Sequence, residues 1–85
     1  MKYPAHVWKQ LRNLTADQLK KALEKDGWAL DARRGAQHVY WHPSGRRVSI
    51  HYHPRKTYGP RLLQGLLDDI GWTVEDLRRL KLIKK

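Results

Sequence analysis

The sequence contains no cysteine, which excludes disulfide bonds and zinc sites built from thiolates. It also contains no apolar run long enough to cross a bilayer. Its first residues, MKYPAHVWKQ, lack the apolar core of a secretory signal. From these three absences we expect a cytoplasmic protein with no membrane span.

Acidic residues are also scarce. Eight Asp and Glu stand against eighteen Lys and Arg, which gives a formal net charge of +10. In a chain of 85 residues, this excess predicts a polyanionic partner such as nucleic acid, or an acidic protein. A surface charged only for solubility is the alternative, although balanced charges would serve solubility equally well.

Local signals along the chain predict both helices and strands. Thr15 and Gln18 have the spacing of a capping box, and Gly27 suits the residue after a helix end. Alternating apolar and polar residues around turns at 34–36 and 43–46 predict three strands. The expected elements are a short helix within 6–14, a helix at 16–26, strands at 28–33, 37–42 and 47–53, a helix from Pro60 to 70, and a short helix after Thr73.

This order predicts a single α+β domain over residues 1–85. A three-stranded antiparallel sheet is expected to carry helices on one face, with extra short helices at both ends, in a two-layer arrangement. The expected core covers residues 16–72, with an N-terminal extension at 1–14 and a C-terminal helical tail at 73–85. Large aromatic side chains are expected to anchor this core, namely Trp28, Trp41 and Trp72.

The turn predicted at residues 43–46 fixes how the second and third strands pair. It places His38 opposite His51, and directly opposed residues share a face of the sheet. The apolar face is expected to turn toward the helices, since a slip by one residue would bury the histidines instead. The expected inner set is Val39, Trp41, Val48 and Ile50, and the expected outer set is His38, Tyr40, His42, Arg47, Ser49 and His51, with His53 beyond them.

The expected outer set contains the residue types that metal-free RNA cleavage requires. Histidine can act as base or acid because its pKa lies near neutrality, arginine binds phosphate, and tyrosine can stack on an unpaired base. Exposed His and Arg on a strand can equally be solvated residues without a role. The candidate catalytic residues are His38 and His51, with His53 as an alternative acid, and the candidate RNA-binding residues are Arg33, Arg34, Tyr40, His42, Arg47 and His53.

A metal site is a further use for the same histidines. His38 and His51 would approach each other across the strands, with His42 or His53 nearby. However, no cysteine assists, the carboxylates lie elsewhere in the sequence, and basic surroundings repel a cation. We therefore expect no metal and no cofactor.

Three segments together carry a family pattern: LKKALEKDGWALDARRGAQHVYWHP, RRVSIHYHP and YGPRLLQGLLDDIGW. They resemble the HicA (YcfA-like) toxins of bacterial toxin–antitoxin modules. Those toxins combine a helix that ends in a Gly-aromatic pair, a strand, a Gly-Ser turn followed by His, an aromatic strand that ends in His-Pro, and a Gly-led helix. The similarity extends over residues 16 to 72.

The resemblance implies a double-stranded-RNA-binding-like α-β-β-β-α fold and an mRNA interferase, which is a metal-independent endoribonuclease that cleaves mRNA and is neutralised by a HicB-type antitoxin. The family's catalytic histidine follows the turn glycine and falls on His38 as general base. Ala36 stands in place of the family's Ser, and Gln37 stands where many members have His. The alternative is therefore a basic module of the same fold that binds RNA or an antitoxin without cleavage.

Overall fold

The computed structural model describes residues 3–84 of the chain. The predicted helices and strands are all present, with small shifts at their ends. The elements are α1 (Ala5–Leu11), α2 (Ala16–Lys25), β1 (Ala29–Arg34), β2 (Gln37–Trp41), β3 (Arg47–His51), α3 (Pro60–Ile70) and α4 (Val74–Arg79).

Local signals account for the helix ends. At the start of α2, the Gln18 backbone N–H donates to the Thr15 hydroxyl at 3.2 Å, and the Thr15 N–H donates to the Gln18 side chain at 2.9 Å. Thr73 and Asp76 form the same reciprocal capping box at the start of α4. At the end of α3, Gly71 adopts a φ of +79°, a conformation that strongly favours glycine.

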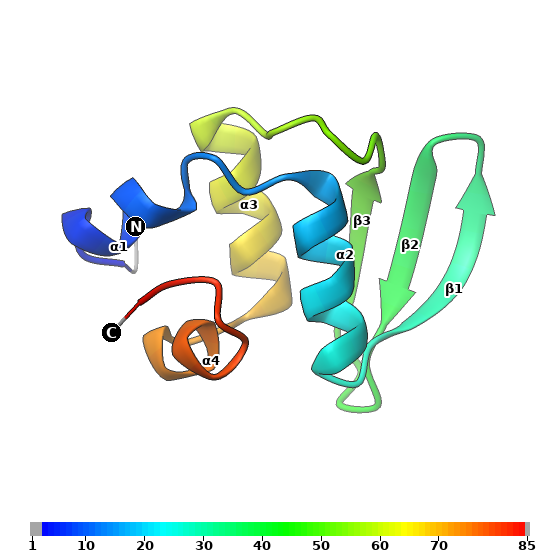
Figure 1. The fold of residues 1–85 in the computed structure, drawn as a ribbon. Coiled ribbons are helices and arrows are strands. Elements are labelled where there is room, and N and C mark those ends of the chain that lie inside the picture. Colours follow the sequence, from blue (N-terminus) through cyan, green and yellow to red (C-terminus); the bar gives the residue numbers. More distant parts are fainter. Residues whose placement is uncertain (1–2, 85) are drawn as a thin grey trace.

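The elements form two layers, as predicted for an α+β domain. The sheet is antiparallel with the order β1-β2-β3, and α2 and α3 cover one of its faces. The short helices α1 and α4 lie on the side of these two helices away from the sheet (Figure 1). The order is compatible with a double-stranded-RNA-binding-like fold. Leucine and isoleucine side chains dominate the interior, including Leu19, Leu23, Leu63, Leu67 and Ile70.

The turn between β2 and β3 is one residue shorter than predicted. The His42 N–H donates to the Arg46 carbonyl at 2.9 Å, and the Gly45 N–H donates to the His42 carbonyl at 2.8 Å. Gly45 has a φ of +95°. These contacts define a three-residue loop, Pro43–Gly45, in which a tight turn is followed by a left-handed glycine.

The shorter loop moves the pairing register by one residue. His38 pairs with Ile50, and Tyr40 pairs with Val48. The prediction that His38 lies opposite His51 is therefore wrong, because Gln37 occupies that place.

This register reverses the predicted faces of β2 but not those of β3. Val48 and Ile50 are buried beneath the helices as expected, but their partners are His38 and Tyr40 rather than Val39 and Trp41. Side chains alternate across a strand, so Val39 and Trp41 lie on the outer face. Trp41 exposes 39 % of its surface, and its predicted role as a core anchor is wrong.

Strand β1 forms an edge of the sheet and is exposed along its whole length. It lies beyond the cover of the helices, and the exposed Leu30 on it reflects that position (Figure 1). The register shifts between Leu30 and Ala32, so Asp31 is a bulge residue. After the bulge, Arg33 pairs with His38 and therefore shares its helix-facing side.

One carboxylate joins the ends of three helices. Asp26, just after α2, accepts hydrogen bonds from the indole N–H of Trp28 at 3.1 Å and of Trp72 at 2.7 Å, and from Arg79 at 2.6 Å. Burial by itself raises the pKa of Asp26, but the hydrogen bonds from Trp72, Arg79 and Trp28 outweigh it and lower the pKa. Trp28 and Trp72 are buried, as predicted.

Candidate functional site

His38 lies on β2, on the sheet face that the helices cover. Its ring stacks on Tyr52 with 4.9 Å between the ring centroids and 20° between the planes, and the Tyr40 ring lies 6.5 Å away. Only 7 % of the residue is exposed. Nδ1 is enclosed and has no hydrogen-bond partner within residues 3–84, so the ring meets solvent along its other edge, which carries Nε2.

The surroundings of His38 keep its imidazole neutral. Burial is the largest cause that lowers its pKa below the usual 6.5, and the positive charges of Arg33 and Lys20 lower it further. A neutral imidazole has a free lone pair near pH 7. His38 therefore has the protonation state that a general base requires.

Two cations from different elements flank His38. Arg33 lies directly across the pairing between β1 and β2, on the same face. Lys20 projects from α2, and its Nζ lies 5.4 Å from the centroid of the Tyr52 ring that stacks on His38. Both charges would attract a phosphate bound beside the imidazole, which suits a group that develops negative charge.

Tyr52 links the histidine to helix α2. Its hydroxyl donates to Asp17 Oδ1 at 3.0 Å, and this bond is a cause that raises the pKa of Tyr52, after burial. The other carboxylate oxygen of Asp17 lies 3.2 Å from Lys21 Nζ. Asp17 thus holds the Tyr52 ring against His38.

Sequence reasoning missed Lys20 and Tyr52 as members of this site. Lys20 was not among the residues chosen from the sequence, but it is only partly exposed. One signal was available, since Lys20 is flanked on α2 by the buried Leu19 and Leu23, at the boundary of the apolar stripe. Tyr52 carries no local signal, because its contact with Asp17 spans 35 positions along the chain.

The predicted site residues divide between the two faces of the sheet. His38 and Arg33 face the helices, whereas His51, Arg34 and Arg47 belong to the outer face. Tyr40 was predicted to be an exposed stacking residue, and that placement is wrong. It exposes 1 % of its surface and its hydroxyl is enclosed.

The outer residues make contacts of their own. Arg47 lies 3.3 Å from the carboxylate of Asp31 in the β1 bulge. The His51 ring lies 5.1 Å from that of His53, which lies in the loop after β3. Among the described residues, no ring contact joins either histidine to His38, whose ring neighbours are Tyr40 and Tyr52.

His42 closes the hairpin loop. Its Nδ1 accepts a hydrogen bond from the Ser44 backbone N–H at 3.1 Å and lies 2.9 Å from the Ser44 hydroxyl. The ring packs against Trp28, with 5.2 Å between centroids. Through these contacts, His42 stabilises the turn.

Within residues 3–84, no three His, Asp or Glu side chains are grouped so that they could hold a metal ion. In the same range, none of the helices has the length and apolar character needed to cross a membrane.

Comparison with known proteins gives one family. A family profile described as the HicA toxin of bacterial toxin–antitoxin matches residues 16–72, which is two thirds of the chain. Among curated proteins, none matches significantly. The matched range begins at α2, ends after α3 and includes the whole sheet with His38, Arg33, Lys20 and Tyr52. By this match, the chain belongs to the HicA toxin family of bacterial toxin–antitoxin systems.

Proposed function

We propose that this protein is a toxin that cleaves mRNA in the cytoplasm by a metal-independent mechanism and is neutralised by a HicB-type antitoxin. The observation that carries the proposal is the neutral His38 between two cations, Arg33 and Lys20. The net charge of +10 adds long-range attraction for a polyanion.

In the proposed reaction, His38 is the general base. Its Nε2 takes the proton of the ribose 2′-hydroxyl, and the oxygen attacks the adjacent phosphorus. The bond from phosphorus to the 5′-oxygen breaks, and that oxygen takes a proton from water. Arg33 and Lys20 offset the charge that builds on the phosphoryl oxygens, and the products are a 2′,3′-cyclic phosphate and a 5′-hydroxyl.

Incubation of purified protein with mRNA in EDTA tests the proposal. The wild type should cleave, and His38→Ala should not, while both retain the same circular dichroism spectrum. His38→Gln provides a second variant of similar size in case the alanine form unfolds. Cleavage that EDTA abolishes would contradict the metal-free mechanism, and an antitoxin encoded by a neighbouring gene should inhibit the wild type.

A second candidate function is RNA or antitoxin binding without cleavage. It is favoured by the 7 % exposure of His38, and by Ala36 and Gln37 at the positions where the resemblance implies Ser and often His. Absence of cleavage by the wild type, with RNA binding that weakens steeply as salt rises, would establish this function instead.

A further inference from the structure

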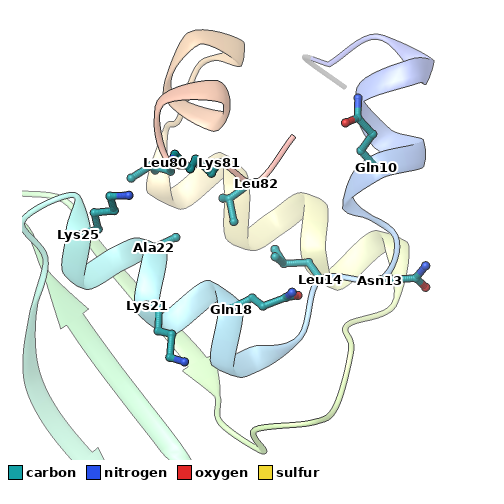
Figure 2. Close-up of a pocket in the computed structure, with 10 residues that line it drawn as sticks. All are labelled: Gln10, Asn13, Leu14, Gln18, Lys21, Ala22, Lys25, Leu80, Lys81 and Leu82. Atoms are coloured by element: carbon teal, nitrogen blue, oxygen red, sulfur yellow. The ribbon is translucent and has the colours of Figure 1, made fainter. Parts of the chain in front are cut away.

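A cavity of about 400 Å³ lies on the opposite side of α2 from the sheet. Figure 2 shows it between α2, the end of α1 with the segment that follows, and the segment after α4. The α1 and α4 segments lie outside residues 16–72, so the walls that close the cavity are additions to the family core. This volume falls in the range of small-molecule and cofactor sites.

The lining of this cavity combines aliphatic side chains with positive charge. Leu14, Ala22 and Leu82 contribute apolar surface, and the Leu82 side chain points toward α2 (Figure 2). The charged side chains around them are Lys21, Lys25 and Lys81, and no acidic or aromatic residue lines it within the described chain.

Lys81 occupies a backbone position that favours glycine. Its φ is +61°, and it is the single non-glycine residue of the described chain with a positive φ. The Leu82 N–H donates to the Leu77 carbonyl at 2.9 Å, which ends α4 in the same way as the bond from Trp28 to Leu23 ends α2. In the α2 motif the corresponding residue is Gly27.

Lys81 thus stands where the corresponding place after α2 has a glycine, which indicates a role for the lysine side chain. Side chains in the left-handed region are strained, and such strain is concentrated at functional sites. Lys81 at this position lines a cavity with two further lysines, an arrangement that suits a negatively charged ligand.

We propose that this cavity binds an acidic segment of a partner protein, with an aliphatic side chain of that segment on its apolar floor and carboxylates beside the lysines. The proposal goes beyond RNA cleavage and does not depend on it. Charge complementarity carries the argument, because every charged residue in the lining is a lysine.

RNA fits the cavity less well for two reasons. No aromatic ring in the lining offers a surface on which a base could stack. In addition, Asp17 stands between the two sites, since it contacts both Lys21 of the cavity and Tyr52 beside His38. This carboxylate would repel a phosphate chain that ran from one site to the other.

Selection from a displayed library of random peptides tests the proposal. The full chain is compared with Lys25→Glu/Lys81→Glu, and with Lys9→Glu/Lys56→Glu, which has the same net charge but an intact cavity. The wild type and the second variant should enrich peptides that combine Asp or Glu with Leu, Ile or Val, and the first should not. Equal loss of peptide enrichment in both variants would overturn the proposal. Enrichment of peptides without acidic residues would overturn it as well.

A single enriched peptide then allows a finer measurement. Its affinity by fluorescence anisotropy should fall roughly tenfold in Lys25→Glu/Lys81→Glu. Lys81→Gly should also weaken binding, while its Tm stays equal or rises because glycine relieves the strained φ. Full affinity in Lys81→Gly, or displacement of the peptide by an uncleavable 2′-O-methyl oligoribonucleotide, would contradict the proposed ligand.

Discussion

On the helix-facing side of the β2–β3 hairpin, two polar aromatic residues, His38 and Tyr40, are buried beside Val48 and Ile50. On the outer side, the apolar Val39 pairs with Ser49 and Trp41 pairs with Arg47. A count of apolar residues on β2 alone would place these faces the other way round. The difference shows that the length of the hairpin loop decides which side of β2 is buried, and that His38 lies at the edge of the core.

The largest expected contrast is between the two histidines once predicted to face each other. His38→Ala should lower RNA cleavage about 100-fold or more, because it removes the proposed base. His51→Ala should leave cleavage within about twofold, since His51 lies on the other face. Initial rates on one RNA substrate measure both. A comparable loss in the two variants would mean that the outer face takes part in catalysis.

Neighbouring residues on β2 provide the contrast in stability. Tyr40→Ala should lower the free energy of unfolding by about 3–5 kcal/mol, because it leaves a cavity in the core. Trp41→Ala should cost about 1 kcal/mol or less, since much of its side chain is already exposed. Urea unfolding followed by circular dichroism measures both. Tyr40→Phe is the matched control and should be nearly neutral, because the enclosed hydroxyl has no partner in the described chain.

Adjacent arginines on β1 sharpen the comparison further. Arg33→Gln should lower kcat/KM about tenfold, which corresponds to about 1.4 kcal/mol of transition-state stabilisation. Arg34→Gln removes the same charge from the outer face and should have a much smaller effect. Equal losses would indicate that net charge, rather than position beside His38, is what the arginines supply.

The smallest effect is expected in the dependence of stability on pH. The pKa of His38 is lower in the folded state than its usual value of 6.5, so the unfolded chain binds the proton more readily. The contribution of His38 to stability is therefore fully present above pH 6.5 and is lost as pH falls through the folded-state pKa. Urea midpoints from pH 7.5 down to acid should show this slope, and His38→Gln should flatten it. An unchanged slope in that variant would mean that His38 is not held neutral.

The sequence predicted what is encoded locally. The capping boxes at Thr15 and Thr73, Pro60 and the glycines that end helices fix the elements through contacts within a few residues. The faces of β2 were not predicted, because the apolar pattern of Val39 and Trp41 favoured the wrong side. Gly45 was the informative residue, since a left-handed glycine after a two-residue turn favours the three-residue loop.

The candidate site could be predicted from the sequence only in part. His38 and Arg33 could be chosen by residue type and by family resemblance. Lys20 and Tyr52 enter through tertiary packing, which brings α2 over the end of β3. Neither residue lies near His38 in the sequence, so no spacing pattern could associate them.

The hydrogen bonds that Asp26 accepts from tryptophans also provide a fluorescence probe of folding. Two of the protein's four tryptophans, Trp28 and Trp72, donate to that single carboxylate from positions 2 and 46 residues away in the chain. Their fluorescence should therefore report when the end of α2 docks against the end of α3. Trp41, on the open sheet face, should instead be accessible to soluble quenchers. Tryptophan fluorescence can thus distinguish folding of the core from changes at the exposed face of the sheet.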